Sequence, residues 1–574
     1  MPNRAAWLFL TLSVTLPAVG QTYSSQMRGA SSVTSPAPTL TVTTRLVQIN
    51  VLVHDHHGRP IGDLTKDDFV VTDQGKPQTI SLFTIDKRLA TPSVASSGVM
   101  ARNVVTNRPT QTAGQGSVTV LLLDFYNTKL TDQMYARRQL IKFLRQIQPG
   151  DQIGIYALKG SGFSIVHDFT NNGEALEEAL ERVMPGFSHE LDASSPEPAS
   201  TADDNVNDII DTSNTVVATF FTWNRVINTC EAFKALANHL EGIPGRKNLV
   251  WVSGGFPIDI GFGDSDDRTR SPLFSQIAAN DPELFADYIE AASVALNTAN
   301  VAIYPVDARG LMGLPMADAS KNIRVNPRTH SIPPEFMHVD MRNIDTMNYI
   351  AELTGGKAFY NTNDIGGAVR RAIDDSAVTY TLGYYVAEDN WDNKYHKIKV
   401  RVKRPGVTVR TKKGYLAVEQ PASPSASQLD SLLRDAVWSP LDYTTLGLTA
   451  RIDPSAALPN ASLFRFLIDP SELQFRQENG KYQASLDVLF VQQTRQGKRI
   501  ADYKKTLNIA ATPAQYQNLK AKGMLVSEDL RLTPNTQAVR IVVLDRFSGT
   551  LGSLTIPITP ADRSSSQLPP SSTR

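Results

Sequence analysis

The sequence predicts an α/β protein: a central doubly wound, mostly parallel sheet flanked by N-terminal and C-terminal β-sandwich-like domains. The runs at 118–123 and 248–252 are almost entirely apolar, which is typical of parallel strands buried on both faces. Segments with helical periodicity alternate with such runs throughout residues 117–378. This alternation indicates parallel strands joined by right-handed crossovers, with helices covering both faces of the sheet.

The elements of the central domain are expected in a regular order. Predicted strands are 118–123, 153–158, 163–169, 248–252, 301–306 and 357–360, and predicted helices are 132–147, 174–183, 225–241, 284–298, 344–353 and 365–375. Residues 185–215 are polar and are interpreted as an irregular insertion, and residues 308–340 as a long loop. Pro149-Gly150 is a clear stop signal for the first helix.

The N-terminal flank, residues 41–88, is predicted to be a small β domain of immunoglobulin-like type. Its first strand is marked by apolar residues at every second position, Val47, Ile49, Val51 and Val53, and this period of two indicates a half-buried strand. Residues 89–116 are polar and are predicted to be a linker.

Strand-like segments continue after the central domain. Residues 379–418 are a predicted β extension, which either extends the sheet at its edge or forms a module beside it. The Pro-, Ser- and Ala-containing stretch 419–428 is a predicted linker, 429–560 a C-terminal β-rich domain, and 561–574 a disordered tail.

The N-terminus has the pattern of a secretory signal peptide, predicted as residues 1–20. Arg4 is followed by an apolar stretch at 5–16 and by Ala18-Val19-Gly20, which resembles a cleavage site. The apolar stretch is shorter than the ~20 residues of a spanning helix. A secreted or periplasmic protein is therefore expected, with a disordered leader at 21–40 and no transmembrane segment after cleavage.

Composition and motifs limit the function. Lys+Arg and Asp+Glu both number 57, so no electrostatic attraction to nucleic acid is predicted. No Gly-x-Ser-x-Gly elbow, Walker loop or dinucleotide fingerprint occurs, which argues against the common hydrolases, ATPases and dehydrogenases. The single cysteine, Cys230, is expected to be a small buried hydrophobic residue.

Polar residues follow three of the predicted strands, at the edge where doubly wound sheets bind ligands. The candidate ligand-binding residues are Asp124, Tyr126, Asn127, Thr128, Ser253, Gly254 and Asp307. A carboxylate with a hydroxyl four residues later can reach one Mg²⁺ or Ca²⁺ ion. The same residues can also serve as helix-capping and turn residues, and both readings stay open.

Six sequence motifs occur together within residues 40–417: 46–51 (LVQINV), 64–69 (LTKDDF), 122–128 (LLDFYNT), 244–257 (PGRKNLVWVSGGFP), 304–311 (YPVDARGL) and 351–359 (AELTGGKAF). On these motifs the chain resembles the von Willebrand factor A family, and more narrowly a branch common in Acidobacteria and related soil bacteria. The resemblance covers residues 40–417. It implies a metal-ion-dependent adhesion site built from an Asp-x-Ser-x-Ser loop, a lone Thr and a lone Asp.

This chain departs from that adhesion motif. Asp124 matches the first Asp, Thr128 replaces the second Ser and Thr229 corresponds to the lone Thr, so these three are the candidate metal ligands. Tyr126 stands where the first Ser is expected, and Ser253 where the last Asp often stands. The resemblance thus implies a degenerate site with too few charged oxygens to hold Mg or Ca strongly. A metal-free ligand groove at the same edge is the favoured expectation, with weak binding of Mg or Ca as the alternative.

The expected function is that of an exported binding or scaffold protein with an unknown protein or glycan partner, no nucleic-acid partner and no catalytic residues. The alternative is an exported hydrolase in which Asp124 and Asp307 act as paired carboxylates.

Overall fold

The computed structural model describes residues 45–87, 104–108, 117–194, 204–255, 284–311, 335–386, 391–417, 423–458 and 461–559. All of them belong to one compact unit that begins at Thr44. The predicted signal peptide, leader and C-terminal tail lie outside the described residues, as do parts of the predicted linkers. Within the described part of the chain, no helix combines the length and the apolar character needed to cross a bilayer.

The first β domain is built from two segments that are far apart in the sequence. Strand β1 (Arg45–His54) pairs antiparallel with β11 (Val378–Val386), in the sheet order β13-β1-β11-β4, where β4 is Leu82–Lys87 and β13 is Thr408–Arg410. The second sheet has the order β14-β12-β2-β3, with β14 Gly414–Leu416, β12 Tyr395–Val402, β2 Phe69–Asp73 and β3 Lys76–Gln78. A short 3-10 helix, Lys66–Asp68, precedes β2.

The two sheets share one apolar core. The predicted alternation in β1 is observed, since Val47, Ile49, Val51 and Val53 are all buried in it. The segment predicted as a β extension at 379–418 therefore pairs with the N-terminal strands and not with the central parallel sheet.

The central sheet has the order β10-β9-β6-β7-β8. Its strands are β6 (Val118–Asp124), β7 (Gln152–Lys159), β8 (Gly162–Thr170), β9 (Lys247–Ser253) and β10 (Val301–Asp307). Four strands run parallel, and the edge strand β8 runs antiparallel to β7 as the second arm of a hairpin. The predicted mostly parallel α/β sheet is thus present.

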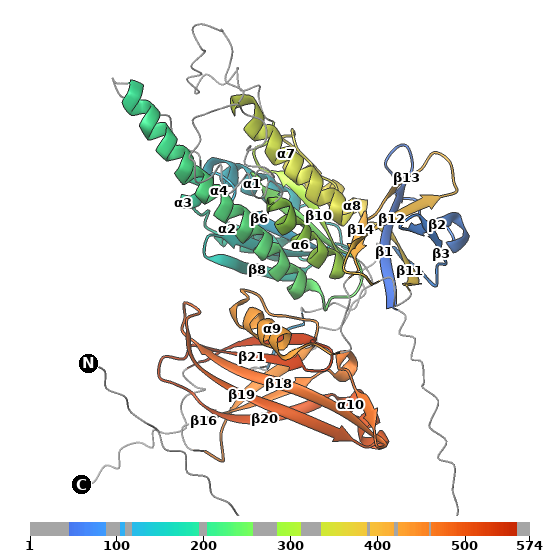
Figure 1. The fold of residues 1–574 in the computed structure, drawn as a ribbon. Helices are drawn as coiled ribbons and strands as arrows, with labels where there is room; N and C mark the ends of the chain where they lie inside the picture. Colours follow the sequence, from blue (N-terminus) through green and yellow to red (C-terminus); the bar gives the residue numbers. More distant parts are fainter. Residues whose placement is uncertain are drawn as a thin grey trace, which may run out of the picture. The chain divides into compact units, whose positions relative to one another are not determined.

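Helices cover both faces of this sheet (Figure 1). One face packs against α1 (Leu130–Leu144), α2 (Gly173–Arg182) and α8 (Ile365–Asp375), and the other against α4 (Asp204–Leu240), α6 (Leu284–Thr298) and α7 (Glu335–Thr354). Consecutive residues of β6 point to opposite faces. Leu121 lies in the apolar core that includes α1, α2 and α8, and Leu122 lies in the core that includes α4, α6 and α7. Both faces of the strand are therefore buried, which explains its apolar run.

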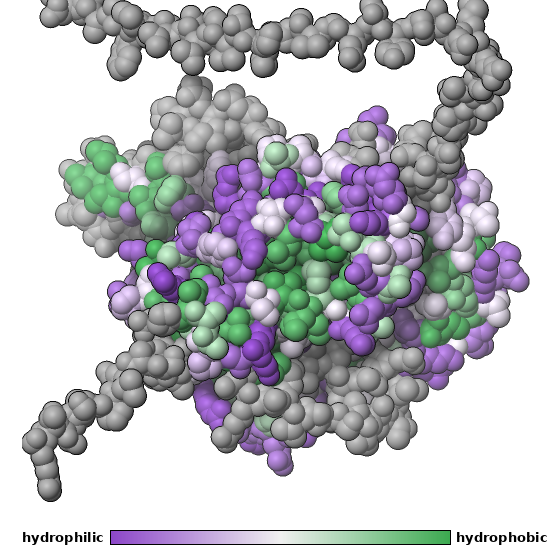
Figure 2. Space-filling model, turned by 90° about the horizontal axis from the view of Figure 1, so that it is seen from below, coloured by the Kyte–Doolittle hydropathy of each residue, from purple (hydrophilic) through white to green (hydrophobic). Residues whose placement is uncertain are grey.

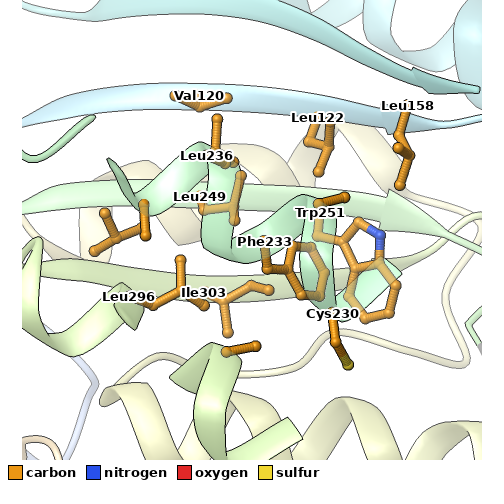
Figure 3. Close-up of a cluster of buried hydrophobic side chains, with 14 of the residues drawn as sticks. Val120, Leu122, Leu158, Cys230, Phe233, Leu236, Leu249, Trp251, Leu296 and Ile303 are labelled. Atoms are coloured by element: carbon orange, nitrogen blue, oxygen red, sulfur yellow. The ribbon is translucent and has the colours of Figure 1, made fainter. Parts of the chain in front are cut away.

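Figure 3 shows the core on the α4 side, where Cys230 and Phe233 of α4 lie beside Trp251 of β9. Cys230 is fully buried, and burial raises the pKa of its thiol to about 12. The expectation that Cys230 is buried among apolar residues is confirmed.

Several predicted boundaries in the central domain are wrong. Helix α4 begins at Asp204, not near Arg225, and α3 (His189–Ala193) lies in the segment interpreted as irregular. No Gly or Pro occurs between 204 and 241, so nothing in this stretch ends a helix. Helix α7 likewise starts earlier than predicted, at Glu335, and the predicted strand at 357–360 is reduced to one bridge between Val306 and Phe359.

The C-terminal domain also consists of two antiparallel sheets around one core. Its strands are β15 (Leu448–Pro454), β16 (Ala461–Ile468), β17 (Arg476–Glu478), β18 (Lys481–Gln493), β19 (Arg499–Ala511), β20 (Met524–Arg531), β21 (Ala538–Asp545) and β22 (Leu551–Pro557). Helices α9 (Ala426–Trp438) and α10 (Pro513–Lys522) each begin with a capping box, and a 3-10 turn covers Pro470–Glu472.

One strand of the C-terminal domain comes from the predicted 89–116 linker. Strand β5 (Val104–Thr106) pairs with β15, so that linker contains a structural element.

Figure 2 shows the surface of the molecule as seen from below the view of Figure 1. Apolar side chains gather in the middle of this surface, among hydrophilic ones.

Candidate binding site at the carboxyl edge of the parallel sheet

Asp124, the last residue of β6, is fully buried and saturated with hydrogen bonds. Its Oδ1 accepts from the backbone N–H groups of Tyr126 (3.1 Å) and Asn127 (2.9 Å). Its Oδ2 accepts from Asn127 Nδ2 (2.9 Å), Trp251 Nε1 (2.9 Å) and Ser253 Oγ (2.8 Å). Burial raises the pKa of Asp124 above its ordinary value, while the hydrogen bonds act in the opposite direction.

Asn127 connects Asp124 to helix α4. Its Nδ2 also lies 2.8 Å from Thr229 Oγ1, and its Oδ1 accepts a 3.0 Å hydrogen bond from the guanidinium of Arg225. Thr229 in turn donates to the carbonyl of Arg225. One amide therefore joins the buried carboxyl of β6 to a buried cation on α4.

Arg225 provides a positive charge beside Asp124. Its side chain is almost completely buried. Burial lowers the pKa of the guanidinium to about 10, and the neighbouring Asp124 acts in the opposite direction, so Arg225 is charged at neutral pH. A fixed guanidinium thus supplies the positive charge that a buried carboxylate requires.

The backbone of the edge is held by Thr128 and Gly254. Thr128 Oγ1 accepts from the N–H of Gly254 at 2.9 Å. A Cβ atom at residue 254 would lie 2.7 Å from the carbonyl oxygen of Asn127, so a glycine is needed at this position. The loops after β6 and β9 are consequently in direct contact.

Asp307 ends β10 and has a different partner. Arg309 binds it through Nε (2.9 Å) and Nη2 (2.8 Å), and also donates its backbone N–H. Asp307 lies opposite Ser253 in the parallel register. Because β9 separates β10 from β6, the ends of these two strands are about 10 Å apart. The structure thus places Asp307 at the same edge as Asp124 but in a separate ion pair.

Tyr126 is also buried, and its hydroxyl accepts a 3.1 Å hydrogen bond from Asn228 of α4. Every candidate residue named from the sequence therefore lies at one edge of the sheet. The assignment of ligand-binding roles to them stays a prediction.

Sequence reasoning missed three residues that organise this edge, namely Trp251, Arg225 and Gln133. Gln133 donates through Nε2 to the carbonyls of Phe125, Thr128 and Gly186, and so fixes the loop. Trp251 follows the apolar pattern of β9, and Arg225 resembles a surface residue of a helix. No sequence signal distinguishes them, because their roles depend on contacts between distant segments.

The predicted metal ligands do not fit a divalent cation as they are arranged. Asp124 accepts five hydrogen bonds, and the hydroxyls of Thr128 and Thr229 already accept from Gly254 and Asn127. Within the described ranges, no group of three or more His, Cys, Asp or Glu side chains could hold a metal ion. Mg²⁺ and Ca²⁺ require free oxygen ligands, whereas this cluster presents mostly N–H donors to the carboxylate.

Exposed apolar side chains flank this edge. Leu130 and Met134 in the first turns of α1 are 48% and 45% exposed, and Leu311 after β10 is 62% exposed. The two helical positions are four residues apart and share one face of α1. Polar and apolar groups therefore occur together where the parallel strands end.

Comparison with known proteins yields structural matches alone: no protein-family profile and no curated protein matches the chain. One solved structure with similarity is an aerotolerance-related membrane protein from Bacteroides fragilis, with 15% identity, a TM-score of 0.24, and coverage of 45% of this chain and 99% of that one. Another is the SpRpn10 VWA domain, with 9% identity, a TM-score of 0.20, and coverage of 45% and 96%. The architecture described here rests on the strand order and register of the chain itself.

Proposed function

We propose that this chain is an exported binding or scaffold protein of the von Willebrand factor A type, which contacts a partner through the carboxyl edge of its central sheet without a bound metal ion. The support comes from the strand order, with four parallel strands and one antiparallel edge strand, and from the motifs at the strand ends. Export is supported by the signal-peptide pattern of residues 1–20.

The saturation of Asp124 by five donors is the observation that carries the metal-independent proposal. A carboxylate that orders its own loop through these bonds has no need of a cation to do so. Arg225 provides the compensating charge from within the chain. The edge is therefore preorganised before any partner arrives.

Binding is favoured over catalysis by the state of the two carboxyl groups. Asp307 is held in a bidentate pair with Arg309, and Asp124 is buried under its hydrogen bonds. Neither is free to activate water, as a paired-carboxylate hydrolase would require. A protein partner is favoured over a glycan by the exposed Leu130, Met134 and Leu311, because interfaces between proteins use such apolar contacts.

The first test is a thermal unfolding scan of the wild-type protein and of Asp124→Asn, with EDTA, with Mg²⁺ and with Ca²⁺. We expect the cations to leave the Tm of both proteins unchanged. A cation-dependent rise in Tm that the wild type shows and Asp124→Asn lacks would contradict the metal-independent proposal, because a ligand that binds the native state must stabilise it.

The second test concerns the edge as a partner surface. Proteins captured from the native culture by the wild type are compared with those captured by Leu130→Glu/Met134→Glu. The matched control is Leu525→Glu, a similarly exposed position on β20 of the C-terminal domain. We expect the double variant alone to lose the captured protein. Equal capture by all three proteins would place the partner surface elsewhere.

A further inference from the structure

Helix α4 is much longer than the sheet that it covers. Its 37 residues span about 55 Å at ~1.5 Å per residue, whereas the seven residues of β9 span about 23 Å. Arg225 of α4 contacts Asn127 in the loop after β6, at the carboxyl edge. The residues before Arg225 therefore extend beyond that edge, and Figure 1 shows this end of α4 projecting from the α/β domain. We call residues 204–222 the projecting half of α4.

The projecting half lies outside the apolar core of the domain. The side chains of α4 that pack in this core begin at Trp223 and end at Leu240. Before Trp223 the helix exposes large apolar side chains: Ile209 is 67% exposed, Phe220 53% and Val217 48%. A helix that only projects into water is polar on all sides. Several large apolar side chains on one projecting helix therefore indicate a contact surface.

This apolar surface faces away from the sheet. Val217 and Val226 are separated by about two and a half turns, so they lie on opposite sides of the helix axis. Val226 is fully buried in the core, and Val217 therefore points away from it. Glu231 follows Val217 on the same side after about four turns, and it is exposed and pairs with Lys234. The outer side of α4 thus changes from apolar to polar where the helix reaches the sheet.

The apolar positions have the spacing of a coiled-coil seam. Val206, Ile210, Ser213, Val217 and Phe220 follow one another at alternating intervals of four and three residues, which is the heptad pattern of a helix that packs against another helix. We call these five residues the α4 seam. Ile210 and Val217 are β-branched and occupy the same heptad position, which favours two-stranded packing. The α4 seam therefore fits one further helix.

The sequence around the α4 seam is strongly acidic. Between Arg182 and Arg225 it contains no Lys or Arg. Its acidic residues are Glu190, Asp192, Glu197, Asp203, Asp204, Asp208 and Asp211. Two copies of this helix side by side repel each other, whereas a helix with Lys or Arg beside its apolar residues is attracted. The charge therefore favours a basic partner helix over a second copy of this chain.

We propose that the α4 seam binds one amphipathic helix of a partner protein, which has apolar residues at heptad spacing and Lys or Arg beside them. Apolar contacts along the seam provide the affinity, and the opposite charges select the partner. This inference goes beyond the function proposed for the carboxyl edge, because the helix needs no contact with Leu130, Met134 or Leu311.

Two synthetic helical peptides of about four heptads test the charge and the seam together. Both have Ile and Leu at the seam positions, and they differ only in Lys or Glu at the flanking positions. Binding to the full chain is measured by fluorescence anisotropy in about 50 mM salt, where screening is weak. We expect the Lys peptide to bind at least about tenfold more tightly than the Glu peptide. Equal affinities, or binding of neither peptide, overturn the proposal.

Variants of the seam separate apolar contact from simple charge attraction. Val217→Asp/Phe220→Asp adds negative charge, yet we expect it to bind the Lys peptide at least about tenfold more weakly. Val217→Gln/Phe220→Gln, which adds no charge, should show a similar loss. Both side chains are exposed, so the Tm of each variant should stay within about 2 °C of the wild type. Unchanged or tighter binding in either variant overturns the proposal.

Two controls locate the bound peptide. Leu525→Asp changes an exposed apolar residue of the C-terminal domain and should keep the wild-type affinity. Leu130→Glu/Met134→Glu should keep it as well, which distinguishes the α4 seam from the carboxyl edge. A loss of binding in Leu130→Glu/Met134→Glu alone, with Val217→Gln/Phe220→Gln unaffected, would assign the peptide to the edge and contradict this inference only.

Sedimentation of the wild type without peptide tests the remaining occupant, a second copy of the chain. We expect a monomer between about 1 and about 100 μM, because the acidic helices repel each other. A dimer that dissociates in Val217→Gln/Phe220→Gln would assign the α4 seam to self-association and overturn the proposal.

Discussion

The indole Nε1 of Trp251 donates a 2.9 Å hydrogen bond to Oδ2 of Asp124. Trp251 belongs to the fully buried strand β9 and packs edge-on against Phe233 of α4. One side chain therefore joins the apolar core to the polar edge of the sheet. Changes in this core are expected to affect the loop after β6.

Trp251→Phe removes this donor and part of the packing. We expect the free energy of unfolding to fall by about 2–4 kcal/mol, because a buried acceptor loses a partner and a small cavity forms. Urea unfolding measures the loss. Trp438→Phe is the control, since Trp438 is 66% exposed. Equal stabilities of Trp251→Phe and the wild type would mean that the indole bond contributes nothing.

Arg225→Met removes the cation beside Asp124 while keeping an unbranched apolar side chain. We expect a loss of about 3 kcal/mol in unfolding free energy, because the buried carboxyl is left without a compensating charge. The double variant Arg225→Met/Asp124→Asn removes both charges and should recover part of this loss. If the loss of unfolding free energy in the double variant equals the sum of the losses in the two single variants, the two side chains are not coupled.

Gly254→Ala places a methyl group against the carbonyl oxygen of Asn127. The contact of 2.7 Å forces the loops after β6 and β9 apart, and we expect a loss of about 1–3 kcal/mol in unfolding free energy. Gly186→Ala serves as the control, since its Cβ would meet Phe125 at an ordinary 3.7 Å. Similar stabilities of the two variants would show that the loops after β6 and β9 can move apart at little cost in free energy.

His239 makes stability depend on pH. Its Nδ1 lies 2.8 Å from the carbonyl of Asp442 and its Nε2 lies 3.1 Å from Tyr156 Oη, a pattern that suits the neutral ring. Burial lowers the pKa of His239 below its ordinary 6.5. The unfolded chain therefore binds the proton first, and stability should fall as the pH decreases below about 6.5, by up to about 1.4 kcal/mol per pH unit.

His239→Gln should flatten this slope when unfolding is measured by urea between about pH 5 and about pH 7. A residual slope is expected from His54, because burial lowers its pKa as well. The exposed His57 supplies the control, and His57→Gln should keep the full slope. An unchanged slope in His239→Gln would show that His239 is not the titrating group.

The central sheet could be predicted because its signals are local. The apolar runs in β6 and β9 reflect burial on both faces, and the polar residues after them mark the strand ends. Asp124 and Ser253 were therefore expected at one edge, and they are hydrogen-bonded there. Pairings between distant segments, such as β1 with β11 and β5 with β15, leave no local periodicity and could not be predicted.

The contacts around Asp124 illustrate the same limit. In the sequence, Arg225 resembles any solvent-exposed arginine of a helix. Its buried role appears only when α4 packs against the loop after β6. The start of α4 was mispredicted because Asn, Asp, Ser and Thr between 204 and 215 suggest a loop. The continuous absence of Gly and Pro in that stretch was the available signal.

The first β domain has a consequence for the time course of folding. Leu64 and Tyr380, which are hydrogen-bonded within it, are 316 residues apart in the sequence. A chain synthesised or translocated from its N-terminus cannot close this domain until the whole α/β segment has emerged. Early in biogenesis, β1 and β2 must therefore wait with open edges, and exposed edges invite wrong pairing. A chaperone that shields them during this interval would increase the yield of native protein.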